Sequence, residues 1–204
     1  MCATGSQSSL GSCSVQFGVK FAQFYLCEPV HPPERSAVDL TGGLLRVTSG
    51  MIQCIVGAQV ESVALTVTTH LSEPVACLDD YQDVVELSYS SSQGKLNVIT
   101  WGEGCVEEVR LPGNPGPLRI RYHLRNMDLS GRLPELMGQP HVGECLLQIW
   151  PAPMDDDDDL KITSMTARFW HPLQSGRVSF REAGLLSPSV TPEALAALKQ
   201  CGLL

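Results

Sequence analysis

The stretch that decides the fold is GPLRIRYHLRNM, residues 116–127. Apolar side chains occupy every second position in it: Leu118, Ile120, Tyr122 and Leu124. Successive side chains of a β-strand point to opposite faces of its sheet, so this period predicts a strand with one buried face. The side chains between them, expected to face solvent, are Arg119, Arg121, His123 and Arg125.

The same period of two recurs along the chain and predicts a mainly β protein. Residues 83–101 are expected to form a β-hairpin that turns at Gly94. Because many short strands occur without alternating helices, we predict an antiparallel β-sandwich with a C-terminal α-helix. The other segments that fit strands are residues 15–21, 22–27, 44–57, 61–71, 145–150 and 161–170.

The two ends of the chain differ from the middle. Residues 1–14 are small and polar and lack the features of a secretory signal, so a disordered tail is expected there. Residues 15–172 form the predicted sandwich domain, and residues 173–204 a C-terminal extension. Its helix is expected to begin with Thr191 as N-cap and Pro192 at the first helical position.

Composition restricts the classes of partner. The chain has 204 residues, 43% of them hydrophobic, and a formal net charge of −8. This charge argues against nucleic acid as the ligand, because phosphate binding needs clustered cations, and it favours a basic protein partner.

No segment reaches the roughly 18 apolar residues of a membrane span, so a cytoplasmic protein is expected. The eight cysteines are dispersed without a C-x-x-C pair, which predicts reduced structural thiols.

No motif in the sequence points to catalysis or a cofactor. Nucleotide-binding, zinc-protease and serine-hydrolase signatures do not occur, and the histidines are scattered singly, so neither a cofactor nor a metal site is expected. One alternative is a hydrolase whose acid and base come from clustered carboxylates. We favour a turn in which the aspartates bond nearby backbone amides. The carboxylates in question are Asp79, Asp80, Asp83 and Glu86.

A run of like charge follows the predicted strand at residues 145–150. It consists of Asp155, Asp156, Asp157, Asp158 and Asp159. One interpretation is a solvated loop extended by self-repulsion. The other is a row of carboxylates that imitates the phosphates of nucleic acid and steers a basic partner into contact. Glu103, Glu107 and Glu108 would widen this field if they lay nearby.

Two aromatic residues are candidates for the anchoring contact with such a partner. Exposed aromatic side chains often supply much of the binding energy at protein interfaces. Trp101 and Tyr81 are the candidates. The alternative for Trp101 is a core position at the end of a hairpin. A second functional alternative is a sandwich that binds a small molecule or carbohydrate between its loops.

Three segments resemble one protein family in order and spacing. They are LDDYQDVVELSYSSSQGKLNVI (78–99), LPGNPGPLRIRYHLRNMD (111–128) and GECLLQIWPAP (143–153). Between Val15 and Pro153 the chain resembles bacterial proteins similar to the competence-system inhibitor of the DNA-entry nuclease. It departs from them at Cys145, near which the family often has an aromatic residue. The resemblance implies a small cytoplasmic β-sandwich that works by binding.

Together these features predict an acidic, non-catalytic binding protein. Its most concrete form is an inhibitor or immunity-type protein that sequesters a basic partner such as a nuclease. In this hypothesis the aspartate run steers the partner and the two aromatic residues anchor it.

Overall fold

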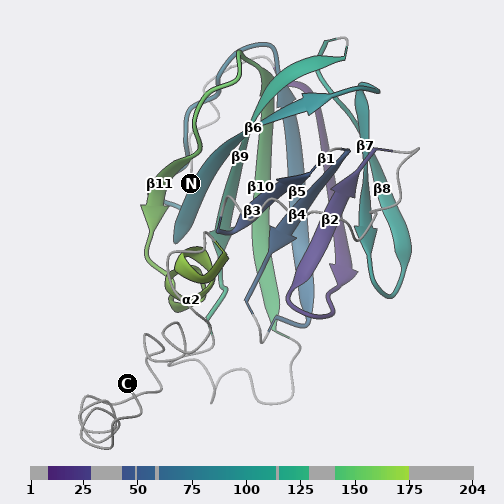
Figure 1. Cartoon of the computed structure of the whole chain (residues 1–204). Coiled ribbons are helices and arrows are strands. Elements are labelled where there is room, and N and C mark those ends of the chain that lie inside the picture. Colours follow the sequence, from purple (N-terminus) through teal and green to yellow (C-terminus); the bar gives the residue numbers. More distant parts are fainter. Residues whose placement is uncertain are drawn as a thin grey trace, which may run out of the picture.

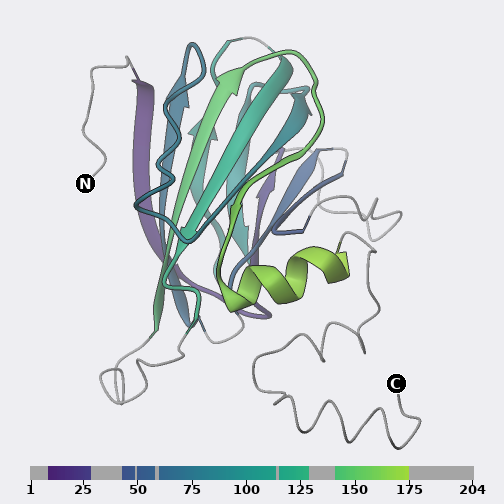
Figure 2. The same ribbon diagram turned by 90° about the vertical axis from the view of Figure 1, so that its left-hand side faces the viewer.

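The structure, a computed structural model, describes residues 9–28, 43–48, 50–57, 60–113, 115–128 and 141–174. Within these ranges the chain is mainly β, as predicted, and its strands form two sheets (Figure 1). Figure 2 gives the same chain turned by 90°, with the single described helix below the sheets. No helix among the described residues is long and apolar enough to span a membrane.

The larger sheet has six strands in the order β1-β5-β10-β9-β6-β11. Its neighbours pair antiparallel except for β10 and β5, which run parallel, so the prediction of a purely antiparallel fold was wrong at this pair. The strands are β1 (Ser9–Gly18), β5 (Ser62–His70), β10 (Val142–Pro151), β9 (Gly116–Arg125), β6 (Asp83–Ser91) and β11 (Asp158–Ile162).

The smaller sheet has five strands in the order β3-β4-β2-β7-β8, all paired antiparallel. The strands are β3 (Leu45–Thr48), β4 (Met51–Ile55), β2 (Gln23–Cys27), β7 (Lys95–Thr100) and β8 (Gly104–Arg110). The helix α2 (Met165–Gln174) follows β11.

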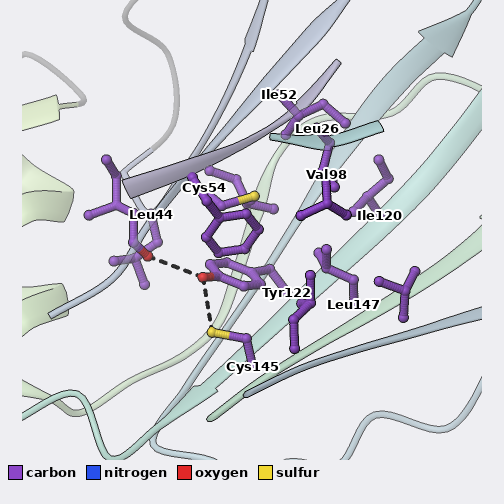
Figure 3. Close-up of a cluster of buried hydrophobic side chains, with 14 of the residues drawn as sticks. Leu26, Leu44, Ile52, Cys54, Val98, Ile120, Tyr122, Cys145 and Leu147 are labelled. Atoms are coloured by element: carbon purple, nitrogen blue, oxygen red, sulfur yellow. Dashed lines mark hydrogen bonds between the residues drawn. The ribbon is translucent and has the colours of Figure 1, made fainter. Parts of the chain in front are cut away.

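The apolar faces of both sheets contribute to one core. Tyr122 of β9 is fully buried, and its ring lies 6.3 Å from that of Phe24 on β2. Its hydroxyl lies 3.3 Å from both the carbonyl oxygen of Ile55 and the Sγ of Cys145 (Figure 3). The prediction that the apolar side chains of β9 face inward is therefore confirmed.

The prediction that the polar side chains of β9 face solvent was wrong for three of the four, since only Arg125 reaches solvent, with 41% of its side chain exposed. Arg119, Arg121 and His123 are 7%, 2% and 0% exposed. Two segments that are not strands cover this outer face of the larger sheet: residues 71–82 and residues 152–157. Alternation along a strand identifies its two faces, but it does not indicate whether loops cover the outer one.

Residues 83–101 do not form the predicted hairpin, because β6 and β7 belong to different sheets. Gly94 does turn the chain, with φ at 67°, but the chain crosses from one sheet to the other. The carboxylate of Glu28 holds this crossing: it accepts hydrogen bonds from Ser91 Oγ at 3.1 Å and from the Ser92 amide at 2.7 Å. Although burial raises the pKa of Glu28, these hydrogen bonds keep it below its ordinary value.

Three element boundaries also differ from expectation. Strand β1 begins at Ser9, inside the predicted disordered tail. Phe21, the last residue of the segment 15–21 expected to be a strand, is 77% exposed in a turn with φ at 60°. Residues 161–170 contain the end of β11 and the start of α2 rather than one strand, because Ser164 accepts the amide of Ala167 as an N-cap. The helix predicted at Thr191 lies outside the described residues.

Candidate functional site

The aspartate run is held in place at both of its ends. The amide of Asp155 donates to Ser88 Oγ at 2.9 Å, and its carbonyl oxygen accepts from Arg119 Nη1 at 3.3 Å. At the other end, Asp158 and Asp159 belong to β11 and pair with β6. All five side chains are exposed. Asp155 to Asp157 thus form a solvent-facing loop whose first residue is hydrogen-bonded to the larger sheet, while Asp158 and Asp159 begin its edge strand.

A buried ion network lies beneath this edge. Glu86 of β6 accepts from Arg119 Nε at 3.1 Å and forms a second ion pair with Arg121 Nε. Arg121 also donates to the carbonyl oxygen of Pro74 at 2.7 Å, and its guanidinium lies 4.9 Å from the ring centroid of Trp150. Buried charges are stable only when paired and hydrogen-bonded, and here the pairing joins the sheet to both covering segments.

The charges of the run repel one another. Although the Asp157 side chain is exposed, partial loss of its hydration against the sheet raises its pKa; Arg119 opposes this shift, while Asp159 and Asp156 add to it. A nearby cation favours the ionised form of a carboxylate. A positively charged surface placed against the run would therefore relieve this repulsion.

Tyr81 lies close to the run but packs onto the sheet. Its carbonyl oxygen accepts from Lys161 Nζ of β11 at 2.7 Å. Its ring is 5.1 Å from that of His123, and the Arg125 guanidinium lies 5.2 Å from the ring centroid. Burial raises the pKa of Tyr81 to about 12. The aromatic surface available to a partner here is therefore partial.

Trp101 lies in the turn between β7 and β8, in the other sheet (Figure 1). It is 57% exposed, so it is not the core residue of the alternative interpretation. Its indole donates to Tyr25 Oη at 3.2 Å, and its ring lies 6.0 Å from that of Phe21. The structure thus forms an exposed aromatic cluster, but not beside the aspartate run. Sequence reasoning missed Phe21; the only signal was the change of phase between residues 15–21 and 22–27.

The second acidic group does not extend the field of the run. Glu103 precedes β8, and Glu107 and Glu108 lie on it. Strand β8 is an edge of the smaller sheet and lies beside β1, whereas β11 is the opposite edge of the larger sheet (Figure 1). The two acidic groups are therefore on opposite sides of the molecule.

Two of the four carboxylates of the hydrolase alternative take part in the fold, whereas Asp79 is exposed. Both oxygens of Glu86 face arginine N–H groups, and Asp83 Oδ1 accepts the amides of Thr163 at 2.7 Å and Ser164 at 2.9 Å. Burial raises the pKa of Asp83 against these hydrogen bonds. In the part of the chain that the structure describes, no three His, Cys, Asp or Glu side chains are grouped to hold a metal ion.

Comparisons with known proteins reach only distant structural neighbours. No protein-family model and no curated protein matches the chain. The crystal structure of ComJ, inhibitor of the DNA degrading activity of NucA, from Bacillus subtilis, is 13% identical, with a TM-score of 0.43 over 71% of this chain and 98% of ComJ. A structure named crocagin biosynthetic gene J is 11% identical, with a TM-score of 0.46 over 72% of this chain and 99% of its own. Neither likeness decides the function of this chain.

Proposed function

We propose that this chain is a non-catalytic, acidic β-sandwich that binds a basic protein partner on its β11 edge. The observation that carries the proposal is the contrast within the aspartate run: the backbone is fixed at Ser88, Arg119 and β6, while every carboxylate is exposed. A charged row that is already ordered loses less conformational entropy on binding than a flexible loop does.

The charge of the whole molecule supports the same proposal. A net charge of −8 attracts a basic partner over distances at which no contact exists, and an ordered row of carboxylates orients it on arrival. The sequence resemblance to competence-system inhibitors suggests a nuclease as this partner. An acidic inhibitor of that kind competes with DNA for the cationic groove of the enzyme. A cytoplasmic location is part of the proposal.

The aspartates also suit a second role, protection of the sheet edge. Exposed edge strands often carry charges that prevent pairing with another chain. Asp158 and Asp159 lie on β11 itself and fit this role, whereas Asp156 and Asp157 precede the strand. Substitution of Asp156 and Asp157, the two residues before β11, therefore distinguishes docking from edge protection.

The test compares three immobilised proteins in capture from a cell extract. They are the unmodified chain, the double variant Asp156→Asn/Asp157→Asn, and a control of equal charge change remote from β11, Glu61→Gln/Glu103→Gln. We expect the unmodified chain and the control to retain the same basic protein, and the aspartate variant to lose it. Equal retention by all three proteins would contradict docking on this edge. Self-association of the aspartate variant without loss of a partner would assign the run to edge protection instead.

A further inference from the structure

The sheet edges of this molecule are not equally protected. Within the described residues, three edge strands carry charged side chains: β11 has Asp158, Asp159 and Lys161, β3 has Arg46, and β8 has Glu107, Glu108 and Arg110. The fourth, β1, reads SLGSCSVQFG over residues 9–18 and contains no charged residue and no proline. A long, uncharged edge is the kind that accepts another strand.

The backbone of β1 presents open hydrogen-bonding groups on that edge. Just beyond the strand, the Val19 amide donates towards β5, to the carbonyl oxygen of Glu61, at 2.9 Å. The Gly18 amide points the other way and donates to Glu103 Oε1 at 3.1 Å. Because antiparallel pairing alternates along a strand, the N–H and C=O groups of Ser12, Ser14 and Gln16 also point away from β5. In the described ranges no strand pairs with them.

A groove of about 320 Å³ adjoins this edge, between β1 and β8. Its apolar lining comes from both sheets: Leu10 and Cys13 of β1, Val67 of β5, and Val109 and Leu111 on the other side. Leu10 is 54% exposed at this position. A strand that paired with β1 would direct alternate side chains into the groove.

The charges around the groove favour a cationic occupant over a second copy of this chain. Burial raises the pKa of the Cys13 thiol, and the negative charge of Glu107 raises it further. Glu103, which accepts the Gly18 amide, lies on the same side, whereas Glu108 is already ion-paired with Lys95 at 2.7 Å. Two copies would each bring a net charge of −8 to the contact, which opposes their association.

We propose that the β1 edge binds an extended segment of another protein by strand addition. The segment has apolar residues at alternate positions, which fill the groove, and lysine or arginine between them. This interface is separate from the β11 edge of the proposed function and does not depend on it.

The test uses a capped synthetic peptide of sequence Lys-Val-Thr-Val-Lys-Val and a pair of variants at one position. Ser14→Pro removes an N–H that points outward, so it leaves the pairing with β5 intact and blocks the added strand. Ser14→Ala is the matched control with an unchanged backbone. We expect the peptide to slow amide hydrogen exchange at Ser12, Ser14 and Gln16 in the unmodified chain. In the Ser14→Ala variant it should slow the exchange at Ser12 and Gln16 in the same way. Ser14→Pro is expected to weaken peptide binding by at least roughly tenfold.

A second variant covers the case in which Ser14→Pro does not fold. Ser14→Lys/Gln16→Lys leaves the backbone donors in place and repels a lysine-containing strand, so it is also expected to weaken binding. The proposal is overturned if both variants bind the peptide like the unmodified chain. It is also overturned if the free chain sediments as a dimer that these variants dissociate, or if the three amides are already protected from exchange in the free monomer.

Discussion

Arg119 Nη1 donates a hydrogen bond of 3.3 Å to the carbonyl oxygen of Asp155. This contact joins the buried ion network of the larger sheet to the first residue of the aspartate run. The same guanidinium is paired with Glu86 and bonded to Ser88 Oγ at 3.1 Å. The position of the exposed carboxylates therefore depends on a charge that is itself almost fully buried.

Replacement of Arg119 by Met is expected to destabilise the fold and loosen the run. Removal of one partner of a buried ion pair typically costs about 3–5 kcal/mol when the remaining charge is left unpaired. Glu86 keeps its ion pair with Arg121, so the loss is expected to fall below this range. Urea unfolding measures the loss, and hydrogen exchange at the amides of Asp155 and Asp158 measures the loosening. The control is Arg119→Lys, which keeps the charge and should lose less. If Met leaves both stability and exchange unchanged, the network does not hold the run.

Stability is expected to decrease as pH falls from 6.5 to 4. Burial lowers the pKa of His123 to about 4, and its Nε2 accepts the Cys77 amide at 3.3 Å, so the folded state holds this ring neutral. The unfolded chain takes up a proton near pH 6.5 and the folded chain only near pH 4. The contribution of His123 is therefore complete above pH 6.5 and lost across this interval, about 3 kcal/mol in all.

The variant His123→Gln isolates this effect, because glutamine does not titrate. The free energy of unfolding, measured by urea between pH 4 and 7, should have a smaller slope in the variant. Some slope should remain, since burial also lowers the pKa of His70. An unchanged slope in the variant would show that His123 titrates normally in the folded state.

The cysteines are expected to differ widely in reactivity towards a thiol reagent. Cys105 is exposed, whereas Cys54 and Cys145 are fully buried and burial raises the pKa of the Cys145 thiol to about 12. Only the thiolate reacts, so rapid labelling of the native chain should occur at Cys105 and labelling of the two buried thiols only on unfolding. Mass spectrometry of labelled peptides, with Cys2 and Cys201 replaced by serine, checks this. Rapid native labelling of Cys145 would contradict the packing in Figure 3.

Glu28 is expected to be important for the crossing between the sheets. Glu28→Ala leaves the buried Ser91 Oγ without this acceptor, and an unsatisfied buried group costs about 1–3 kcal/mol. The Ser92 amide also loses its acceptor, but Ser92 is exposed and water can replace it. Glu28→Gln keeps an acceptor in the same place and should recover part of the loss. Thermal unfolding of the two variants measures the difference. Equal stability of Glu28→Ala and the unmodified chain would contradict the role of this carboxylate.

The sequence predicts the inward faces of the strands well, because burial of an apolar face imposes a period of two. It could not predict which strands share a sheet. Residues 83–101 have the turn and alternation of a hairpin, yet the chain crosses between the sheets there, and Glu28, distant in sequence, accepts a hydrogen bond from the Ser92 amide at the crossing. Nor could alternation predict the burial of Arg119 and Arg121, since the covering segments carry no periodic signal.

The candidate site was predictable in part. A run of five aspartates is evident from the sequence, but its order depends on Ser88 and Arg119, which are far from it along the chain. The groove beside β1 was not predicted at all, because it is formed by strands that meet only in the folded molecule.

The central claim is that the ordered aspartate run receives a basic partner. Its most direct measurement is the association rate of a fluorescent peptide of lysine, arginine and glycine, followed by stopped flow at increasing salt. The unmodified chain and Glu61→Gln/Glu103→Gln should bind it at similar rates that fall steeply with salt, and Asp156→Asn/Asp157→Asn should bind it several-fold more slowly at low salt. Equal rates for all three proteins, or a rate that salt does not change, would contradict the claim.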